Sequence, residues 1–347
     1  MIKRTFHVKH TLAVLAALAL LLSACAPAAS PAAPTAETTF FAMDTVMSLR
    51  VYAGGDGDVL DAAEDRVREV EARWSVTAPD SEISVLNRDG AAELSSETER
   101  LLDAALELCA LTDGALDISI YPVLRAWGFT TGEYAVPDDE AIAALLSRVD
   151  YTKVEYGGRR ASLPDGMEID LGSVAKGCTG DVLAALLREN GVTSALLDLG
   201  GNIQTVGARP DGSPWRVGVR DPEEDGNIGV VQVTDKAVVT SGGYERYFEE
   251  DGVRYWHILD PKTGFPARSG LASVTVIGDS GVLCDGLSTA LFVMGREKAL
   301  DFWRQHRDEC GFELVLVEED GAVTVTEGLE GRFALTERTR TLTVAQG

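Results

Sequence analysis

The chain has 347 residues, and 31 basic against 55 acidic residues give it a formal net charge of −24. Hydrophobic residues make up 45% of the sequence, which excludes a disordered chain and suffices for one large domain or two small ones. The acidic excess argues against nucleic acid as a partner of the globular part.

The first residues are typical of a bacterial lipoprotein signal. Three basic residues precede an apolar run at 11–22 that is too short for an ordinary membrane span. Leu22-Ser23-Ala24-Cys25 then matches a lipobox. We therefore expect residues 1–24 to be a signal peptide and Cys25 to be lipidated. The alternative is an ordinary secretory signal with an incidental cysteine.

Residues 25–39 are rich in Ala, Pro, Ser and Thr and lack apolar periodicity, which predicts a flexible tether. The folded domain is then expected to span 40–347. Because no other apolar stretch of the sequence is long enough to cross a membrane, we expect a lipid-anchored domain at the extracytoplasmic face of the cell membrane.

The hydrophobic pattern predicts a mixture of helices and short strands without an internal repeat. The first expected element is a strand at 40–52. Helices are expected at 59–74, 96–112 (opened by a capping box of Ser96 and Glu99), 138–149, 174–190, 281–294 and 297–308. Further strands are expected at 194–199, 202–208, 215–220, 229–233, 237–241, 244–249, 253–258 and 272–277, with hairpins across Gly157-Gly158, Asp251-Gly252 and Asp320-Gly321. This mixture predicts an α+β fold with mixed, largely antiparallel sheets and flanking helices in one compact domain.

The segment 240–264 combines two glycine-rich turns with a short pair of strands and contains His257-Ile-Leu-Asp260-Pro-Lys-Thr-Gly264. Only His306 would remain beside His257 once the signal is removed. A scarce imidazole near Asp260 and a Pro/Gly turn suits a general base. The segment alone fits a strand histidine near a loop equally well.

A second segment, Asp170-Leu-Gly172-Ser173-Val-Ala-Lys176-Gly177, suits an anion-binding helix start. Free backbone N–H groups at a helix N-terminus favour an anion, and Lys176 would stand one turn into the helix. The P-loop spacing is missing, so an ordinary capped helix with a surface lysine is the alternative.

Two further segments combine glycine, a carboxylate and a polar side chain where a strand meets a turn or a helix. Asp198-Leu-Gly200-Gly201-Asn202 suits either the close approach of a ligand or a tight turn between strands. Asp285 and Thr289 are four residues apart on an expected helix, so they share one face and could offer two hard oxygens to Mg²⁺. Asp285 could instead simply favour the helix N-terminus.

The order of these segments resembles that of the FAD:protein FMN transferase family, also known as the thiamine-biosynthesis lipoprotein ApbE family. The similarity runs from Met43-Asp44-Thr45 to Gly295, and its most specific part is Thr240-Ser-Gly followed by His257-x2-Asp-Pro-x-Thr-Gly. Further matches are Gly114-Ala-Leu-Asp117-Ile-Ser, Trp127-Gly-Phe129, Trp215 with Asp221-Pro222, and Ser273-Val-Thr-Val276.

Members of that family cleave the pyrophosphate of FAD with Mg²⁺, release AMP and join FMN through a phosphoester to a threonine, sometimes a serine, of a target protein. The resemblance implies that Asp285, Thr289 and the backbone oxygen of Ser173 bind the metal and that His257 is the base. The positions that fall where the family contacts FAD are Met43, Thr77, Leu116, Asp117, Ile118, Asp170, Lys176 and Leu259. The family's acceptors are often subunits of membrane redox pumps or exported flavin reductases, so the expected partners are FAD and an exported or membrane-bound flavin-acceptor protein.

Three positions depart from the usual pattern of the family. Asp44 stands where glycine is common, Cys178 where an aromatic residue is usual, and Ser288 where some members carry an aspartate. We expect Asp44 to alter how Met43 lies against the flavin, and we do not expect the Ser288 side chain to bind the metal.

Three functions are compatible with the sequence. The leading hypothesis is flavin transfer to an exported protein. The second uses the same site with water as acceptor, which makes the protein a Mg²⁺-dependent FAD pyrophosphatase that yields FMN and AMP. The third is a non-catalytic, lipid-anchored flavin- or solute-binding protein, but such receptors usually show two βαβ lobes, unlike the hairpin-rich region 194–258.

Overall fold

A nine-stranded sheet forms the centre of the folded part of the chain in the computed structural model, which describes residues 33–55, 57–337 and 339–347. The expected signal peptide, Cys25 and the tether up to residue 32 lie outside the described residues. Within the described ranges no helix is both long and apolar enough to cross a membrane.

The sheet is antiparallel except at one edge, in the order β1-β2-β6-β7-β10-β13-β14-β15-β17, where only β15 and β17 pair in parallel. This arrangement confirms the predicted α+β class with largely antiparallel sheets. The strands are β1 (Ala36–Ala42), β2 (Thr45–Ala53), β6 (Ser194–Leu199), β7 (Asn202–Val206), β10 (Ala237–Gly242), β13 (Leu271–Gly278), β14 (Phe312–Glu318), β15 (Val323–Thr326) and β17 (Leu342–Ala345).

The strand expected at 40–52 is instead a hairpin of β1 and β2. Ala42 pairs with Thr45, and the two residues between them, Met43 and Asp44, both adopt left-handed backbone angles (φ 49° and 59°). Such two-residue turns match the twist of the flanking strands. Because β1 begins at Ala36, the predicted tether is wrong for residues 36–39, and the folded unit starts before residue 40.

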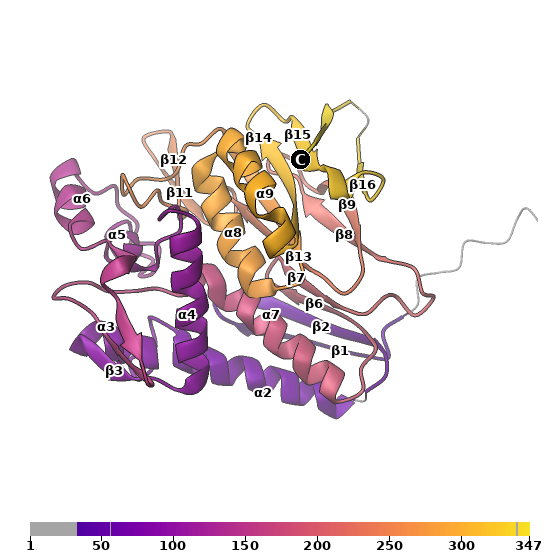
Figure 1. Ribbon diagram of the computed structural model, residues 1–347, viewed down its shortest axis with the longest axis horizontal. Coiled ribbons are helices and arrows are strands. Elements are labelled where there is room, and N and C mark those ends of the chain that lie inside the picture. The colour runs from indigo at the N-terminus through magenta and orange to yellow at the C-terminus, as the bar shows by residue number, and fades with distance from the viewer. Residues whose placement is uncertain (1–32, 56, 338) are drawn as a thin grey trace, which may run out of the picture. The chain divides into compact units, whose positions relative to one another are not determined.

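Helices cover one face of the sheet (Figure 1). The helices that pack directly on its strands are α2 (Gly57–Trp74), α7 (Gly172–Glu189), α8 (Gly281–Met294) and α9 (Arg296–Cys310), and α4 (Ser96–Leu111) packs against α7 and α8. The apolar stripe of α2, which includes Val59, Ala63 and Val67, is buried, as the helical spacing of these residues predicts. The helices and this sheet face together enclose the two largest apolar clusters.

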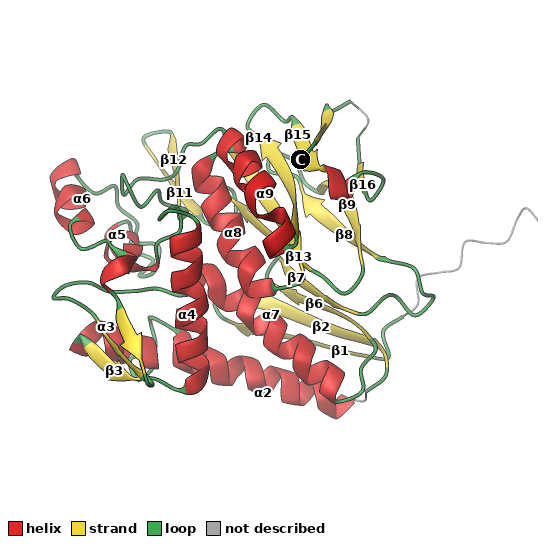
Figure 2. Cartoon of the chain, viewed as in Figure 1, coloured by secondary structure: helices red, strands yellow, loops and turns green. Residues whose placement is uncertain are grey.

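A small three-stranded sheet covers part of the opposite face (Figure 2). Its strands are β8 (Trp215–Arg220), β9 (Asn227–Val233) and β16 (Phe333–Leu335). Trp215 and Val217 from β8 pack against Val238 and Ile277 of the central sheet. β8 alternates strictly between buried and exposed residues, because only one of its faces contacts the core.

The chain between α2 and α7 contains small elements, several of which sequence analysis missed. They are α3 (Glu82–Asp89), β3 (Ala91–Glu93), α5 (Tyr121–Ala126), α6 (Asp139–Leu146) and the predicted hairpin of β4 (Glu155–Gly157) and β5 (Arg160–Ser162). The predicted capping box of α4 is wrong. Ser95, one residue earlier, accepts the N–H of Thr98 and caps the helix, and the Glu99 carboxylate accepts the backbone N–H of Arg159.

Candidate active site

The hairpin of β11 (Tyr247–Glu250) and β12 (Val253–Trp256) places His257 directly after a strand, because β12 ends two residues before the end of the strand expected at 253–258. Asp260 closes the next turn: its carboxylate accepts the N–H of Lys262 at 2.9 Å, and its carbonyl accepts the N–H of Gly264 at 2.7 Å. Among the described residues Asp260 makes no hydrogen bond or ion pair with His257. The Asp260 carboxylate therefore stabilises the turn and does not orient the imidazole of His257.

His257 is held by a backbone carbonyl. Its Nδ1 lies 3.2 Å from the carbonyl oxygen of Arg246, which also accepts the backbone N–H of His257 at 3.1 Å. Because a carbonyl only accepts, the neutral ring carries its proton on Nδ1 and leaves Nε2 with a free lone pair.

The protein environment keeps His257 uncharged at neutral pH. Its side chain is half-buried, with protein atoms on most sides. Burial lowers the pKa of His257 to about 4, and the positive charges of Arg246 and Lys176 act in the same direction. A neutral imidazole with a free Nε2 is the state that a general base requires.

The predicted anion-binding helix start is the beginning of α7. The helix begins at Gly172, so Ser173 lies in its first turn and Lys176 one turn further. No side chain caps this end from the N-cap position, and the N–H of Gly172 donates to Asp170 at 2.9 Å. The N–H groups of Val174 and Ala175 donate to the Leu171 carbonyl, so the N–H of Ser173 and the cation of Lys176 are the groups of this helix start that offer an anion a favourable position.

Helices α7 and α8 cross in close contact at two glycines. A Cβ atom on Gly177 would collide with the carbonyl of Gly281 and come within 2.7 Å of the Asp285 Cβ. Asp181 of α7 caps α8 by accepting the N–H groups of Gly281 at 2.7 Å and Val282 at 3.0 Å. This crossing brings Asp285 against α7, where its Oδ2 accepts the N–H of Gly177 at 2.8 Å.

Asp285 and Thr289 lie one turn apart on α8, as predicted. Asp285 is only 4% exposed. Burial raises its pKa, whereas the charge of Lys176 and the amide groups of Asn202 and Gly177 oppose this rise. Only Oδ2 is held by a well-formed hydrogen bond within the described residues. Oδ1 therefore remains available to a cation.

Hydroxyl groups surround Thr289. Its Oγ1 lies 3.3 Å from the Oγ of Ser241 on β10. The Ser288 hydroxyl lies 2.8 Å from Ser241 and donates to the carbonyl of Asp285 at 2.8 Å. Because the Ser288 oxygen is fully buried and already bonded, its position agrees with the expectation that it does not bind a metal.

These residues suit a hard divalent cation that binds together with a phosphate. Mg²⁺ prefers oxygen ligands and usually combines one or two carboxylates with substrate phosphates. Asp285, Thr289 and the Ser173 carbonyl are all oxygen donors, but no group of three or more His, Cys, Asp or Glu that could hold a metal is found in the described part of the chain. Substrate phosphate oxygens and waters would complete the coordination of Mg²⁺ at such a site.

The Met43 turn is held between α2 and α7. Its N–H donates to Glu71 of α2 at 2.6 Å, and the hydroxyl of Thr179 on α7 lies 3.7 Å from its sulfur. The neighbouring Asp44 is exposed, and its carboxylate pairs with the guanidinium of Arg246 at 2.6 Å. Asp44 thus links the Met43 turn to the residue whose carbonyl holds His257.

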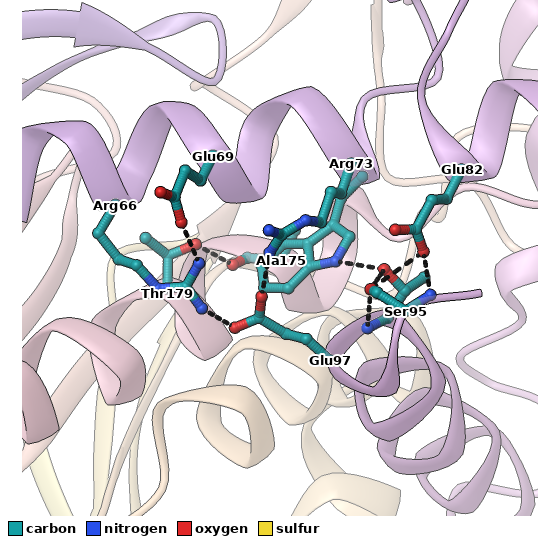
Figure 3. A network of polar contacts seen from close by, with 10 residues as sticks. Arg66, Glu69, Arg73, Glu82, Ser95, Glu97, Ala175 and Thr179 are labelled. Atoms are coloured by element: carbon teal, nitrogen blue, oxygen red, sulfur yellow. Dashed lines mark hydrogen bonds and ion pairs between the residues drawn. The ribbon is translucent and has the colours of Figure 1, made fainter. Parts of the chain in front are cut away.

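A polar network fixes α2 beside that turn (Figure 3). Arg66 and Arg73 of α2 both pair with Glu97 at the start of α4. The hydroxyl of Ser95 donates to the carboxylate of Glu82 on α3 at 3.1 Å. This network joins three helices at the level of the Met43 turn.

The predicted flavin-contacting segment 116–118 lies next to Asp170. The carbonyl of Ile118 accepts the N–H of Asp170 at 2.8 Å. Asp117 caps the short turn that follows: it accepts the N–H of Ser119 at 2.8 Å, the Ser119 hydroxyl at 2.6 Å and the N–H of Tyr151 at 3.2 Å. Leu116 and Ile118 are buried. The Asp117 side chain therefore stabilises this turn, and the backbone of the segment is itself hydrogen-bonded at the Leu116 N–H and the Ile118 carbonyl.

The remaining predicted contacts differ in their surroundings. Burial raises the pKa of Asp170, against the charges of Lys176 and Arg246. Leu259 is buried in a cluster with Trp127 and other aromatic residues. Thr77 is exposed beyond α2 and bonds to Ser75, and no contact among the described residues joins it to His257 or Asp285.

Sequence analysis did not assign Arg246 and Glu245 to the site. Although the Glu245 side chain reaches solvent, burial by the surrounding protein raises its pKa to about 7, against the charges of Lys176, Arg220 and Arg246. The available signal was the charged pair directly after the Ser-Gly-Gly-Tyr turn that precedes β11. Lys176 and Arg246 act on the pKa values of Asp170, Glu245 and His257, so these groups share one electrostatic environment.

Comparison with known proteins shows the family of this chain. The model of the ApbE family matches residues 43–312. The chain is 35% identical over 255 residues to the FAD:protein FMN transferase of Vibrio cholerae, which covers 71% of this chain and 76% of that protein. It is 34% identical over 313 residues to the FAD:protein FMN transferase of Treponema pallidum, with 83% and 86% covered. The crystal structure of the ApbE protein of Thermotoga maritima superimposes with a TM-score of 0.80 at 33% identity, over 86% of this chain and 98% of that chain. This chain belongs to the ApbE family.

Proposed function

We propose that this chain is a Mg²⁺-dependent FAD:protein FMN transferase, which moves FMN from FAD to a threonine or serine hydroxyl of an exported target protein and releases AMP. Relatives that bear this name support the activity. The observation that carries the proposed mechanism is the neutral His257, whose Nδ1 is held by the Arg246 carbonyl.

In this mechanism Nε2 of His257 takes the proton of the acceptor hydroxyl as its oxygen attacks the FMN phosphorus of FAD. A P–O bond to the acceptor forms, the P–O bond of the pyrophosphate breaks, and AMP leaves with the electron pair. A hydroxyl is a poor nucleophile without such a base. The Arg246 carbonyl keeps the ring in its tautomer and stabilises the imidazolium that forms. General-base catalysis of this kind contributes roughly 10²–10⁴-fold in rate.

Lys176 and the start of α7 would hold the pyrophosphate and neutralise its charge. Phosphoryl transfer depends mainly on positioning and charge neutralisation, and the net charge of −24 makes local cations essential here. When bound by Asp285, Thr289 and the Ser173 carbonyl, Mg²⁺ would supply further positive charge to the phosphate oxygens.

The fold weakens the argument for a non-catalytic receptor. A solute receptor usually has two βαβ lobes, whereas this chain has one continuous and largely antiparallel sheet. The activity test is direct: incubation with FAD, Mg²⁺ and a candidate acceptor should give a fluorescent, covalently flavinylated band. The band should disappear with His257→Asn while FAD still binds. A band of full intensity with His257→Asn would refute the assignment of the base.

The proposed location is the extracytoplasmic face of the cell membrane, with a lipid anchor at Cys25. β1 begins at Ala36, so ten residues separate it from Cys25. The wild-type protein should fractionate with membranes and Cys25→Ser should not. Equal membrane binding of both forms would refute the lipid anchor.

A further inference from the structure

Two amide side chains lie in the layer between the sheet and the α7–α8 crossing. Asn202 and Gln204 are two residues apart on β7, so they project to the same face of the sheet. They are 6% and 4% exposed. Their neighbours on β10, Ala237 and Val239, are small apolar core residues.

Neither amide is fully hydrogen-bonded. The Nδ2 donor of Asn202 and the Oε1 acceptor of Gln204 have no partner in the structure. An unpaired buried polar group costs about 1–3 kcal/mol. Apolar side chains at both positions would pack against Ala237 and Val239 without that cost, so these amides call for a functional explanation.

Both amides lie beside Lys176 of α7. They line a cavity of about 10 Å³ together with Lys176 and Gly177. Gly177 donates its N–H to the Asp285 carboxylate, and the Asn202 amide lies close enough to that carboxylate to lower its pKa. A cavity of this size holds about one water molecule. Such a water could accept from Asn202 Nδ2 and donate to Gln204 Oε1.

We propose that Asn202 and Gln204 position Asp285 as a metal ligand: the Nδ2 of Asn202, which has no partner among the described residues, turns to the Asp285 carboxylate when the site is loaded, and Gln204 orients that amide through one water in the shared cavity. This inference rests on the proposed function, since it concerns the same Mg²⁺ site. Replacing a group that hydrogen-bonds to a metal ligand and orients it typically changes metal affinity 10- to 100-fold.

The test measures Mn²⁺ affinity by electron paramagnetic resonance, with FAD present and in a His257→Asn background that prevents turnover. Asn202→Leu should weaken Mn²⁺ binding by about 10- to 100-fold. Gln204→Leu removes only the hydrogen bond between Gln204 and the water, so it should weaken Mn²⁺ binding about 2- to 10-fold. FAD affinity without metal and the thermal midpoint should stay near the parent values, because leucine replaces an incompletely bonded amide.

Asn202→Ala also removes the donor without adding a charge, and it should lose Mn²⁺ affinity as Asn202→Leu does. The matched control is Thr205→Val on the same strand, whose buried hydroxyl bonds to the backbone of Lys236 at 2.9 Å. This control should lower the thermal midpoint and leave Mn²⁺ affinity unchanged.

Two outcomes separate this inference from the metal site itself. If Asp285→Ala removes Mn²⁺ binding while both Asn202 variants fold and bind Mn²⁺ like the parent, the positioning role is wrong. If Asp285→Ala binds Mn²⁺ like the parent, the proposed metal site is wrong, and with it the role of Asn202.

Discussion

The protonation of His257 offers the most specific prediction. Burial and the charges of Arg246 and Lys176 place its pKa at about 4, below the usual value of 6.5. At pH 5.5 the imidazole should then be about 97% neutral, whereas a histidine with the ordinary pKa would be about 9% neutral. This tenfold difference in the population of the base is large enough to measure directly.

The assay is an NMR titration of the imidazole C–H signals in the chain without its expected signal. Only His257 and His306 remain in that chain, and His257→Asn identifies the signal of interest. The His257 shift should stay constant from pH 8 to about 5.5 and change near pH 4. Lys176→Met should raise the pKa of His257, because it removes one of the two cations that lower it. A His257 signal that titrates between pH 6 and 7 in the wild-type protein would refute the reasoning.

Three further predictions concern the surroundings of His257. Asp285→Ala should raise the Mg²⁺ concentration needed for half-maximal activity roughly tenfold or more, since loss of a metal ligand should weaken Mg²⁺ binding at least as much as loss of a group that hydrogen-bonds to that ligand. An unchanged Mg²⁺ titration would remove Asp285 from the ligand set. Gly177→Ala should lower the free energy of unfolding by about 1–3 kcal/mol in urea titrations, because its Cβ would collide with the carbonyl of Gly281; wild-type stability would contradict the close crossing. Asp44→Gly should change the free energy of unfolding by less than about 1 kcal/mol, because the exposed pair with Arg246 contributes little and glycine tolerates the left-handed turn; a loss above 2 kcal/mol would show that the pair is worth more than its exposure indicates.

The parts of the site that local patterns encode could be predicted. Asp285 and Thr289 share a face of α8 because helical spacing is local, and Asp251-Gly252 marks the hairpin that precedes His257. The Met43–Asp44 turn was missed because it lacks the glycine that usually marks a two-residue hairpin.

Other features depend on contacts that no local pattern reveals. The partner of His257 is a backbone carbonyl, which any residue at position 246 would offer. Asn202 approaches Asp285 only because α7 packs against both β7 and α8. Around the cap of α4, Glu82 accepts the N–H of Ser95 and Glu99 accepts the N–H of Arg159, and both contacts come from other segments of the chain.

The central claim is that FMN is transferred to a protein hydroxyl and not to water. The most direct measurement is the ratio of released AMP to protein-bound FMN in a reaction with FAD, Mg²⁺ and an exported acceptor protein. The proposed function predicts a ratio near one and little AMP when the acceptor is omitted. AMP and free FMN formed at the same rate without acceptor would contradict it and identify a FAD pyrophosphatase.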